Sequence, residues 1–327
     1  KYVRHQRYDE AQVLKGDILM GKGDLLASKK VFTELTPDSG NLFLYAVFQV
    51  GKIYRALEDY NGMVEHFENY LDRDDLFNKQ RISEALYWIG WAYTQQNKIE
   101  KSFQIFLVEL ELYGNIPETN EVMLILKVLD DLYLQYRESG YVNQLKDHPL
   151  ITAGNFETWL LTESENAFDT GKFTYASRIN LYLADRLEKQ NRGVEAHNLL
   201  IKIINNVPLE YLDAEGLGKT GLIMEQQGDP LAAERFEMLL ENFPTHPQRA
   251  LAYYGFARLA LKSNDFSRAL SFIDKLTDEL PGHPLTTEST LIRGETLIKM
   301  DRADEAITCY KDLLRLKSTR GRYHARA

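Results

Sequence analysis

The side chains best suited to chemistry in this sequence are seven histidines and a single cysteine, Cys309. No HExxH motif occurs, and no two histidines lie four residues apart, so the spacing of a zinc hydrolase is missing. A nucleophilic thiol needs a nearby histidine and a cationic setting, and neither can be found around Ile307-Thr308-Cys309-Tyr310. We therefore expect a small buried structural residue at Cys309, no metal site and no cofactor.

The sequence has no phosphate-binding loop and no pair of carboxylates in a setting that suits acid–base catalysis. Gly21-Lys22-Gly23-Asp24 follows a helical segment rather than a strand, so it differs from a Walker loop and fits a turn between two helices. Carboxylates are abundant, but they fall on the solvent faces of amphipathic segments. Paired catalytic carboxylates instead need a pocket that raises the pKa of one of them. The sequence therefore predicts a protein that is not an enzyme and has no catalytic residues.

Composition narrows the class of protein further. Hydrophobic residues make up 44% of the 327 residues, which excludes wholesale disorder. The net charge of −9 argues against a nucleic-acid partner, because such a protein needs a basic surface that neutralises phosphates. Charges at helical spacing interrupt every apolar run, so no integral membrane segment is expected. The chain begins with Lys1 rather than methionine, so the sequence does not decide whether the parent protein has a leader or a membrane tether.

A small residue followed four positions later by a large apolar one recurs at intervals of 35–39 residues. The first positions are Ser28, Met63, Ser102, Ala196, Ala232, Ala269 and Ala306, all small except Met63, and the large ones are Phe32, Phe67, Phe106, Leu200, Phe236, Ile273 and Tyr310. On one helix face this pair lets a neighbouring helix come close and then holds it.

A second small position lies upstream of six of these seven pairs. Glycine occupies it in four repeats and alanine in two: Gly51, Gly90, Gly221, Gly294, Ala184 and Ala257. A glycine within a helix costs about 1 kcal/mol relative to alanine. Its recurrence at one repeat position therefore predicts close helix–helix contact.

Gly90-x-x-Tyr93 followed by Asn97-x-Ile99-x-x-Ser102-x-x-x-Phe106 resembles the tetratricopeptide pattern of Gly, Tyr, small residue and aromatic. The tryptophan that the family carries in its first helix is missing from every repeat. The resemblance implies an all-α fold, an αα-superhelix of about eight helix pairs. The pairs are expected at 8–37, 42–72, 80–114, 119–169, 173–207, 210–243, 246–280 and 284–317.

The interval from Ser102 to Ala196 is about 22 residues longer than two repeats require. We place this surplus in an irregular loop at 139–154, between an N-terminal array at 1–138 and a C-terminal array at 155–327. A loop of this length within a compact array is functional or mobile in most proteins. The prolines of His246-Pro247 and His283-Pro284 are expected to begin helices, with the histidines as loop residues.

Neither end of the sequence shows a polar capping helix, so the array is expected to continue in both directions. The three arginines of 318–327 fit the start of a ninth repeat, and binding of an acidic partner is the alternative.

In tetratricopeptide proteins the first helix of each pair lines a concave groove, and the resemblance implies which residues face it here. They are Tyr45, Phe48, Lys52, Tyr87 and Trp91 in the N-terminal half, and Tyr254 and Arg258 in the C-terminal half. Aromatic residues and arginine dominate interface energetics. The alternative is that these aromatics pack against the neighbouring repeat, as we expect for Trp88. The positions that bind chaperone tails in one subgroup match only at Lys52, so that function is not indicated.

The sequence thus predicts a scaffold that binds a segment of a protein or peptide partner. In style, the run from Ala85 to Tyr93 and the Pro-x-His-Pro junctions are similar to repeat proteins of the bacterial cell envelope. These include Tol–Pal-associated proteins, outer-membrane assembly lipoproteins and polysaccharide exporters. A periplasmic location is the resulting expectation. A cytosolic adaptor and a peptide-sensing regulatory module are the alternatives.

Overall fold

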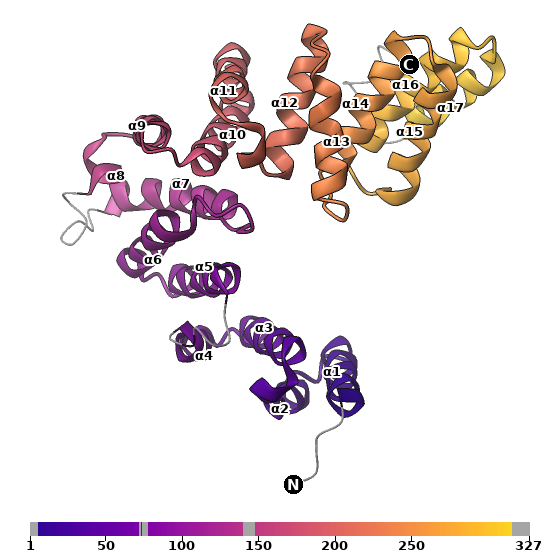
Figure 1. The fold of residues 1–327 in the computed structure, drawn as a ribbon. Coiled ribbons are helices and arrows are strands. Elements are labelled where there is room, and N and C mark those ends of the chain that lie inside the picture. Colours follow the sequence, from indigo (N-terminus) through magenta and orange to yellow (C-terminus); the bar gives the residue numbers. More distant parts are fainter. Residues whose placement is uncertain (1–5, 72, 74–77, 140–147, 316–327) are drawn as a thin grey trace. The chain divides into compact units, whose positions relative to one another are not determined.

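The computed structural model describes residues 6–71, 73, 78–139 and 148–315, and their regular structure is entirely helical (Figure 1). It comprises α1 (Gln6–Gly21), α2 (Leu25–Thr33), α3 (Asn41–Ala56), α4 (Tyr60–Leu71), α5 (Lys79–Gln95), α6 (Ile99–Tyr113), α7 (Val122–Ser139), α8 (Pro149–Thr152), α9 (Phe156–Asp169), α10 (Phe173–Lys189), α11 (Gly193–Asn206), α12 (Ala214–Gln227), α13 (Ala232–Asn242), α14 (Arg249–Lys262), α15 (Phe266–Glu279), α16 (Leu285–Lys299) and α17 (Ala303–Arg315), with short 3-10 helices at Pro37–Ser39 and Leu209–Tyr211. The predicted all-α fold is confirmed. Within the described ranges, no helix is both long and apolar enough to cross a membrane.

The chain forms two compact units, Lys1–Ile179 and Asn180–Ala327, and α10 spans the point of division. Our predicted division placed the break earlier, in the loop at 139–154. Part of that segment is helical, since α8 occupies Pro149–Thr152, and residues 140–147 lie outside the described part of the chain. The predicted division at 1–138, 139–154 and 155–327 stays a prediction, and 318–327 also lies outside the described residues.

Tight turns with one residue of positive φ connect the two helices of each pair. This residue lies seven positions after the small residue of the first helix. The turn residues are Gly23, Glu58, Asn97, Asn191, Gly228, Asn264 and Asp301. Glycine, asparagine and aspartate tolerate this left-handed conformation best, which explains every position except Glu58. So short a connection makes the two helices antiparallel neighbours.

An eighth turn of the same kind joins α9 to α10 at Gly171, whose φ is 71°. The residue seven positions before it is Ser164, which is buried. Helix α10 therefore has a tight turn at each end, at Gly171 and at Asn191. This differs from the predicted pairs 119–169 and 173–207, which assigned α9 only to the preceding helix.

The glycines of the first helices lie directly against the aromatic rings of the second helices. A Cβ added at Gly90 would lie 2.6 Å from the ring of Phe106, and one at Gly221 would lie 2.6 Å from Phe236. The same contact joins three further pairs: Gly16 and Phe32, Gly51 and Phe67, and Gly294 and Tyr310. A side chain at these glycines would occupy space already filled by a ring, so the pairs can pack this closely only with glycine there.

The small residues of the second helices are buried beside these contacts. Ser28 donates a hydrogen bond to the carbonyl oxygen of Gly16 (2.8 Å), and Ser102 donates one to the carbonyl oxygen of Gly90 (3.0 Å). At the equivalent places stand four alanines with at most 1% of their surface exposed: Ala196, Ala232, Ala269 and Ala306. The two helices of a pair are thus joined by a tight apolar contact. In two repeats a hydrogen bond joins the same two helices.

We expect Gly90→Leu to lower the free energy of unfolding by about 1–3 kcal/mol or more, because the new side chain overlaps the buried ring of Phe106. Thermal unfolding followed by tryptophan fluorescence measures this, since Trp88, Trp91 and Trp159 all lie in the unit Lys1–Ile179. Gly21→Leu is the control, because a Cβ at Gly21 would meet no atom within 4 Å. Equal losses at the two positions would show that overlap with Phe106 is not the cause.

Candidate functional site

The first candidate surface lies where the C-terminal end of α3 meets α5. Here Arg55, Tyr60, Tyr87, Trp88 and Trp91 form what we call the aromatic cluster. The ring of Trp91 packs edge-on against Tyr60 and Trp88, with centroids 5.8 Å apart in both cases. The Arg55 guanidinium lies 5.5 Å from the ring centroid of Trp88 and 5.7 Å from that of Trp91. All four aromatic side chains are half-buried, so each keeps part of its surface open to solvent.

The structure brings only some of the predicted N-terminal groove residues together. Tyr87 and Trp91 are in the aromatic cluster, and Lys52 is exposed one helical turn before Arg55. Phe48 is instead 6% exposed and packs against Phe67, with ring centroids 5.4 Å apart, so it belongs to the core.

Tyr45 and Trp88 also differ from what the sequence suggested. The Tyr45 hydroxyl donates a hydrogen bond to the Asp17 carboxylate (2.9 Å), which holds this exposed ring against α1. Trp88, which we assigned to the core, is half-buried beneath Arg55. Arg55 itself was not assigned to the groove, although it lies one turn after Lys52 on the same helix.

In the C-terminal unit, the predicted groove residue Arg258 is engaged within the protein. Its Nε lies 2.9 Å from the carboxylate of Glu225, a side chain with no exposed surface. Lys262, one turn further along α14, lies 2.6 Å from the same carboxylate. The Arg258 guanidinium also covers the ring of Tyr254 at 5.8 Å. Arg258 therefore neutralises a buried charge, and a partner would have to compete with that pairing.

A buried carboxyl group, Glu109, and a half-buried one, Glu121, lie near the aromatic cluster. The Ser83 hydroxyl lies 2.7 Å from Glu109 Oε1 and 3.3 Å from Glu121 Oε2, and its single proton can serve only one of them fully. The Glu109 Oε2 atom is buried without a hydrogen-bond partner in the described part of the chain. Burial raises the pKa of Glu109 well above its usual range; the hydrogen bond from Ser83 opposes this, and the charge of Glu121 adds to it. With 1% exposure, Glu109 cannot touch a substrate, and its burial favours the protonated form.

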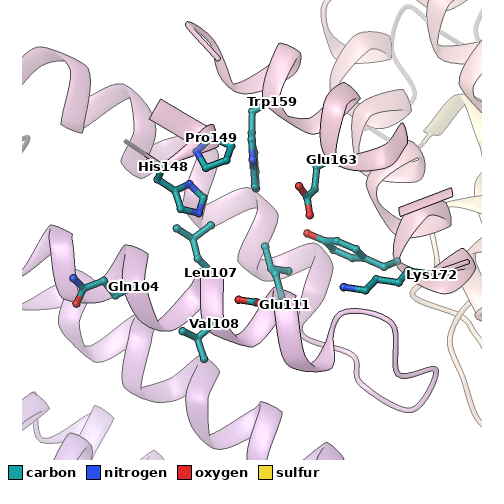
Figure 2. A pocket seen from close by; sticks show the side chains of 11 residues that line it. Gln104, Leu107, Val108, Glu111, His148, Pro149, Trp159, Glu163 and Lys172 are labelled. Atoms are coloured by element: carbon teal, nitrogen blue, oxygen red, sulfur yellow. The ribbon is translucent and has the colours of Figure 1, made fainter. Parts of the chain in front are cut away.

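A pocket of about 470 Å³ forms the second candidate site (Figure 2), entirely within the unit Lys1–Ile179. We call it the α6–α9 pocket. Gln104, Leu107, Val108, Leu110 and Glu111 of α6, His148 and Pro149 at the start of α8, Trp159 and Glu163 of α9, Lys172, and Tyr175 of α10 line it. Figure 2 shows Glu163 and Lys172 on one side, His148 and Pro149 on the other, and Leu107 and Val108 on α6. The sequence analysis identified none of these residues as a site, because they come from four separate helices.

His148 has a structural role at the edge of this pocket. Its ring Nδ1 accepts a hydrogen bond from the backbone N–H of Leu150 (3.1 Å), which caps α8. The same bond recurs at the other two His-Pro dipeptides, from Gln248 to His246 and from Leu285 to His283, at 3.2 Å in both cases. Burial lowers the pKa of His148, with Glu111 opposing the shift, so the ring is neutral at pH 7 with its proton on Nε2.

Arg178 of α10 binds the turn that follows α6. Its guanidinium donates hydrogen bonds to the backbone oxygens of Gly114, Ile116, Pro117 and Thr119, at 2.6–3.0 Å, and to the Thr119 hydroxyl. These bonds hold the turn between α6 and α7 against α10. Gly114 in that turn lies directly against the ring of Tyr175, where a Cβ would come within 2.8 Å of it.

The remaining reactive groups form no further site in the described residues. No cluster of three or more His, Cys, Asp or Glu side chains there could hold a metal ion. Cys309 is half-buried rather than fully buried as predicted, and burial raises the pKa of its thiol. A raised pKa leaves little thiolate at neutral pH, so the thiol of Cys309 is not activated as a nucleophile.

Paired helices, tight turns and glycine–aromatic contacts define a helical-repeat protein. Models of the tetratricopeptide repeat match residues 84–108, 221–284 and 289–320. The chain therefore carries tetratricopeptide repeats in these three segments, and the first of them includes most of the motif at Gly90–Phe106 that predicted the family. No curated protein matches the chain.

Similar solved structures include the TPR2AB domain of yeast Sti1 in a pHSP90 complex, with 13% identity, a TM-score of 0.35, and coverage of 89% of this chain and 99% of that one. Yeast Tom70 is similar at 13% identity and a TM-score of 0.37, over 94% of this chain and 69% of its own. A human IFIT1 dimer with PPP-AAAA shows 15% identity and a TM-score of 0.38, over 92% of this chain and 67% of its own.

We expect Glu109→Gln to raise stability at pH 8 and to make it less dependent on pH. Folded Glu109 keeps a proton that the unfolded chain releases above its ordinary pKa of about 4.3, so the free energy of unfolding falls as the pH rises through this range. Glutamine keeps the neutral form at every pH. The retained Glu121, whose pKa burial also raises, leaves part of the slope.

The measurement is the denaturant midpoint between pH 5 and pH 8, followed by tryptophan fluorescence. Glu118→Gln, at an exposed position, is the control. A loss of stability that is equal at every pH would show that Glu109 is ionised in the folded protein.

Proposed function

We propose that this chain is a non-enzymatic scaffold that binds a segment of a partner protein on the aromatic cluster and the adjoining Lys52. Proteins with tetratricopeptide repeats bind protein or peptide partners, which supports the general class. The observation that carries the proposal is the exposed guanidinium of Arg55 above the half-buried rings of Trp88 and Trp91. Tryptophan, tyrosine and arginine are the residues that contribute most to binding energy at protein interfaces.

The charges around the aromatic cluster favour a particular kind of segment. Among the described residues, neither Lys52 nor Arg55 has an acidic partner, and both are exposed. Two unpaired cations beside half-open aromatic rings complement an apolar side chain flanked by acidic residues. An extended segment and a helical segment both present such a pattern.

The C-terminal residues Tyr254 and Arg258 are the second candidate for the partner-binding site. The ion pair between Arg258 and the buried Glu225 weighs against it, because freeing Arg258 would leave part of that charge unneutralised. Lys52 and Arg55 carry no such cost. We therefore favour the N-terminal surface.

The compartment in which the scaffold acts is a separate proposal. The similarity in style to cell-envelope repeat proteins favours the periplasm of a bacterium, and a cytosolic adaptor is the alternative. Fractionation of cells that produce the parent protein distinguishes the two, because a periplasmic protein leaves the cell on osmotic shock while a cytosolic one is retained.

We expect a Tyr87→Ala and Trp91→Ala double variant to lose at least about tenfold in affinity for the partner, the usual effect of removing an important interface aromatic. The partner is first recovered by a pull-down with the parent protein, and its affinity is then measured directly by calorimetry. Circular dichroism establishes that the variant keeps its helical content. Val194→Ala, at a side chain 77% exposed in α11, is the control. Unchanged affinity in a folded double variant would exclude the aromatic cluster as the principal site.

A further inference from the structure

The α6–α9 pocket carries an excess of negative charge. Glu111 and Glu163 face one ammonium group, Lys172, while His148 is neutral at pH 7. Burial raises the pKa of Glu163, Lys172 opposes this, and Glu111 raises it further, as expected for two carboxylates that repel each other. A second cation between them would relieve this repulsion, whereas an anion would increase it.

An unused hydroxyl group marks the same pocket. Tyr175 is 3% exposed and lines the pocket, yet its hydroxyl has no hydrogen-bond partner among the residues that the structure describes. Burial and the neighbouring Glu163 raise its pKa well above the usual range, so the group stays protonated and neutral. A ligand with several N–H donors can satisfy its oxygen together with the carboxylates.

The walls of the pocket accept an aliphatic stem. Trp159 is almost fully buried with its indole along the pocket, and Leu107 and Pro149 complete the apolar lining. The apolar surface continues from the pocket along α6, where the lining residue Val108 is 44% exposed and Leu112, outside the pocket, is 60% exposed. Lysine and arginine combine a stem of this kind with a charged head, and an apolar neighbour in the same polypeptide would cover Val108 and Leu112.

We propose that the α6–α9 pocket binds an arginine or lysine side chain of a partner polypeptide, with an apolar residue beside it on α6. The basic head lies between Glu111 and Glu163 and donates to the Tyr175 hydroxyl, while its stem packs against Trp159. This second binding site is independent of the aromatic cluster, and it selects a basic segment where the aromatic cluster selects an acidic one.

The indole N–H signals of the three tryptophans provide the test, because one nitrogen–proton correlation spectrum reports Trp159 in the pocket and Trp88 and Trp91 in the aromatic cluster separately. The probes are the peptides acetyl-Leu-Arg-Leu-amide and acetyl-Leu-citrulline-Leu-amide, which differ only in the charged head, and ethylguanidinium as a free cation. Each probe is titrated into the full chain, into its Glu163→Gln and Glu111→Gln variants, and into the Glu118→Gln control.

We expect the arginine peptide to shift the Trp159 signal in a saturable manner and the citrulline peptide to bind at least about tenfold more weakly, the usual effect of losing one charged hydrogen bond. Glu163→Gln and Glu111→Gln should weaken the arginine peptide by a similar factor, with Glu118→Gln unchanged. Equal binding of the two peptides, shifts confined to Trp88 and Trp91, or no shift of Trp159 at millimolar peptide would each overturn the proposal. Ethylguanidinium binding as tightly as the peptide would overturn the assignment to a polypeptide.

Discussion

The contact between a glycine in one helix and an aromatic ring in the next is the constraint on which the rest of this structure depends. It is made five times in the described residues, with Gly90 and Phe106 as a representative pair. Because no side chain intervenes, the helices approach closely, and the tight turn seven residues after the glycine is short enough to join them. The binding surfaces follow from this packing. Trp88 and Trp91 flank Gly90 in α5, and the contact of Gly90 with Phe106 fixes which side of α5 faces α6.

Regular features of this kind could be predicted from the sequence, whereas features that join distant elements could not. Spacing alone identified four of the five glycines, all except Gly16, together with the small residues and the rings, because each contact repeats with the period of the chain. Phe48 was misplaced because a helix position shows which neighbours a side chain can reach, but not how deeply they cover it. The α6–α9 pocket was missed because Glu111, Trp159 and Tyr175 have no common spacing and meet only after folding. The buried pairing of Glu225 with Arg258 and Lys262 was also missed, because charged residues are expected on the surface.

The protein stabilises its buried charged groups in three different ways. The Arg178 guanidinium donates hydrogen bonds to backbone oxygens of a single turn. The Glu225 carboxylate pairs with two cations of α14. At Glu109 burial raises the pKa and so favours the protonated form, because the hydrogen bond from Ser83 alone does not compensate for its desolvation. Each solution fits the cost of burying a polar group, which is large unless partners or protonation offset it.

The glycine–ring contact lies within one helix pair in five repeats, so most of what defines a pair is encoded in a single stretch of gene. Duplication of such a stretch copies a unit whose internal fit is already complete, and only the face toward the next pair must then be adjusted. Phe236 shows that adjustment, since it lies against Gly221 of its own pair and also against Gly255 of the following one. An array built in this way can gain repeats by gene duplication, and the outer residues of each copy can then diverge. Different surfaces, such as the aromatic cluster and the α6–α9 pocket, can therefore arise along one ancestral plan.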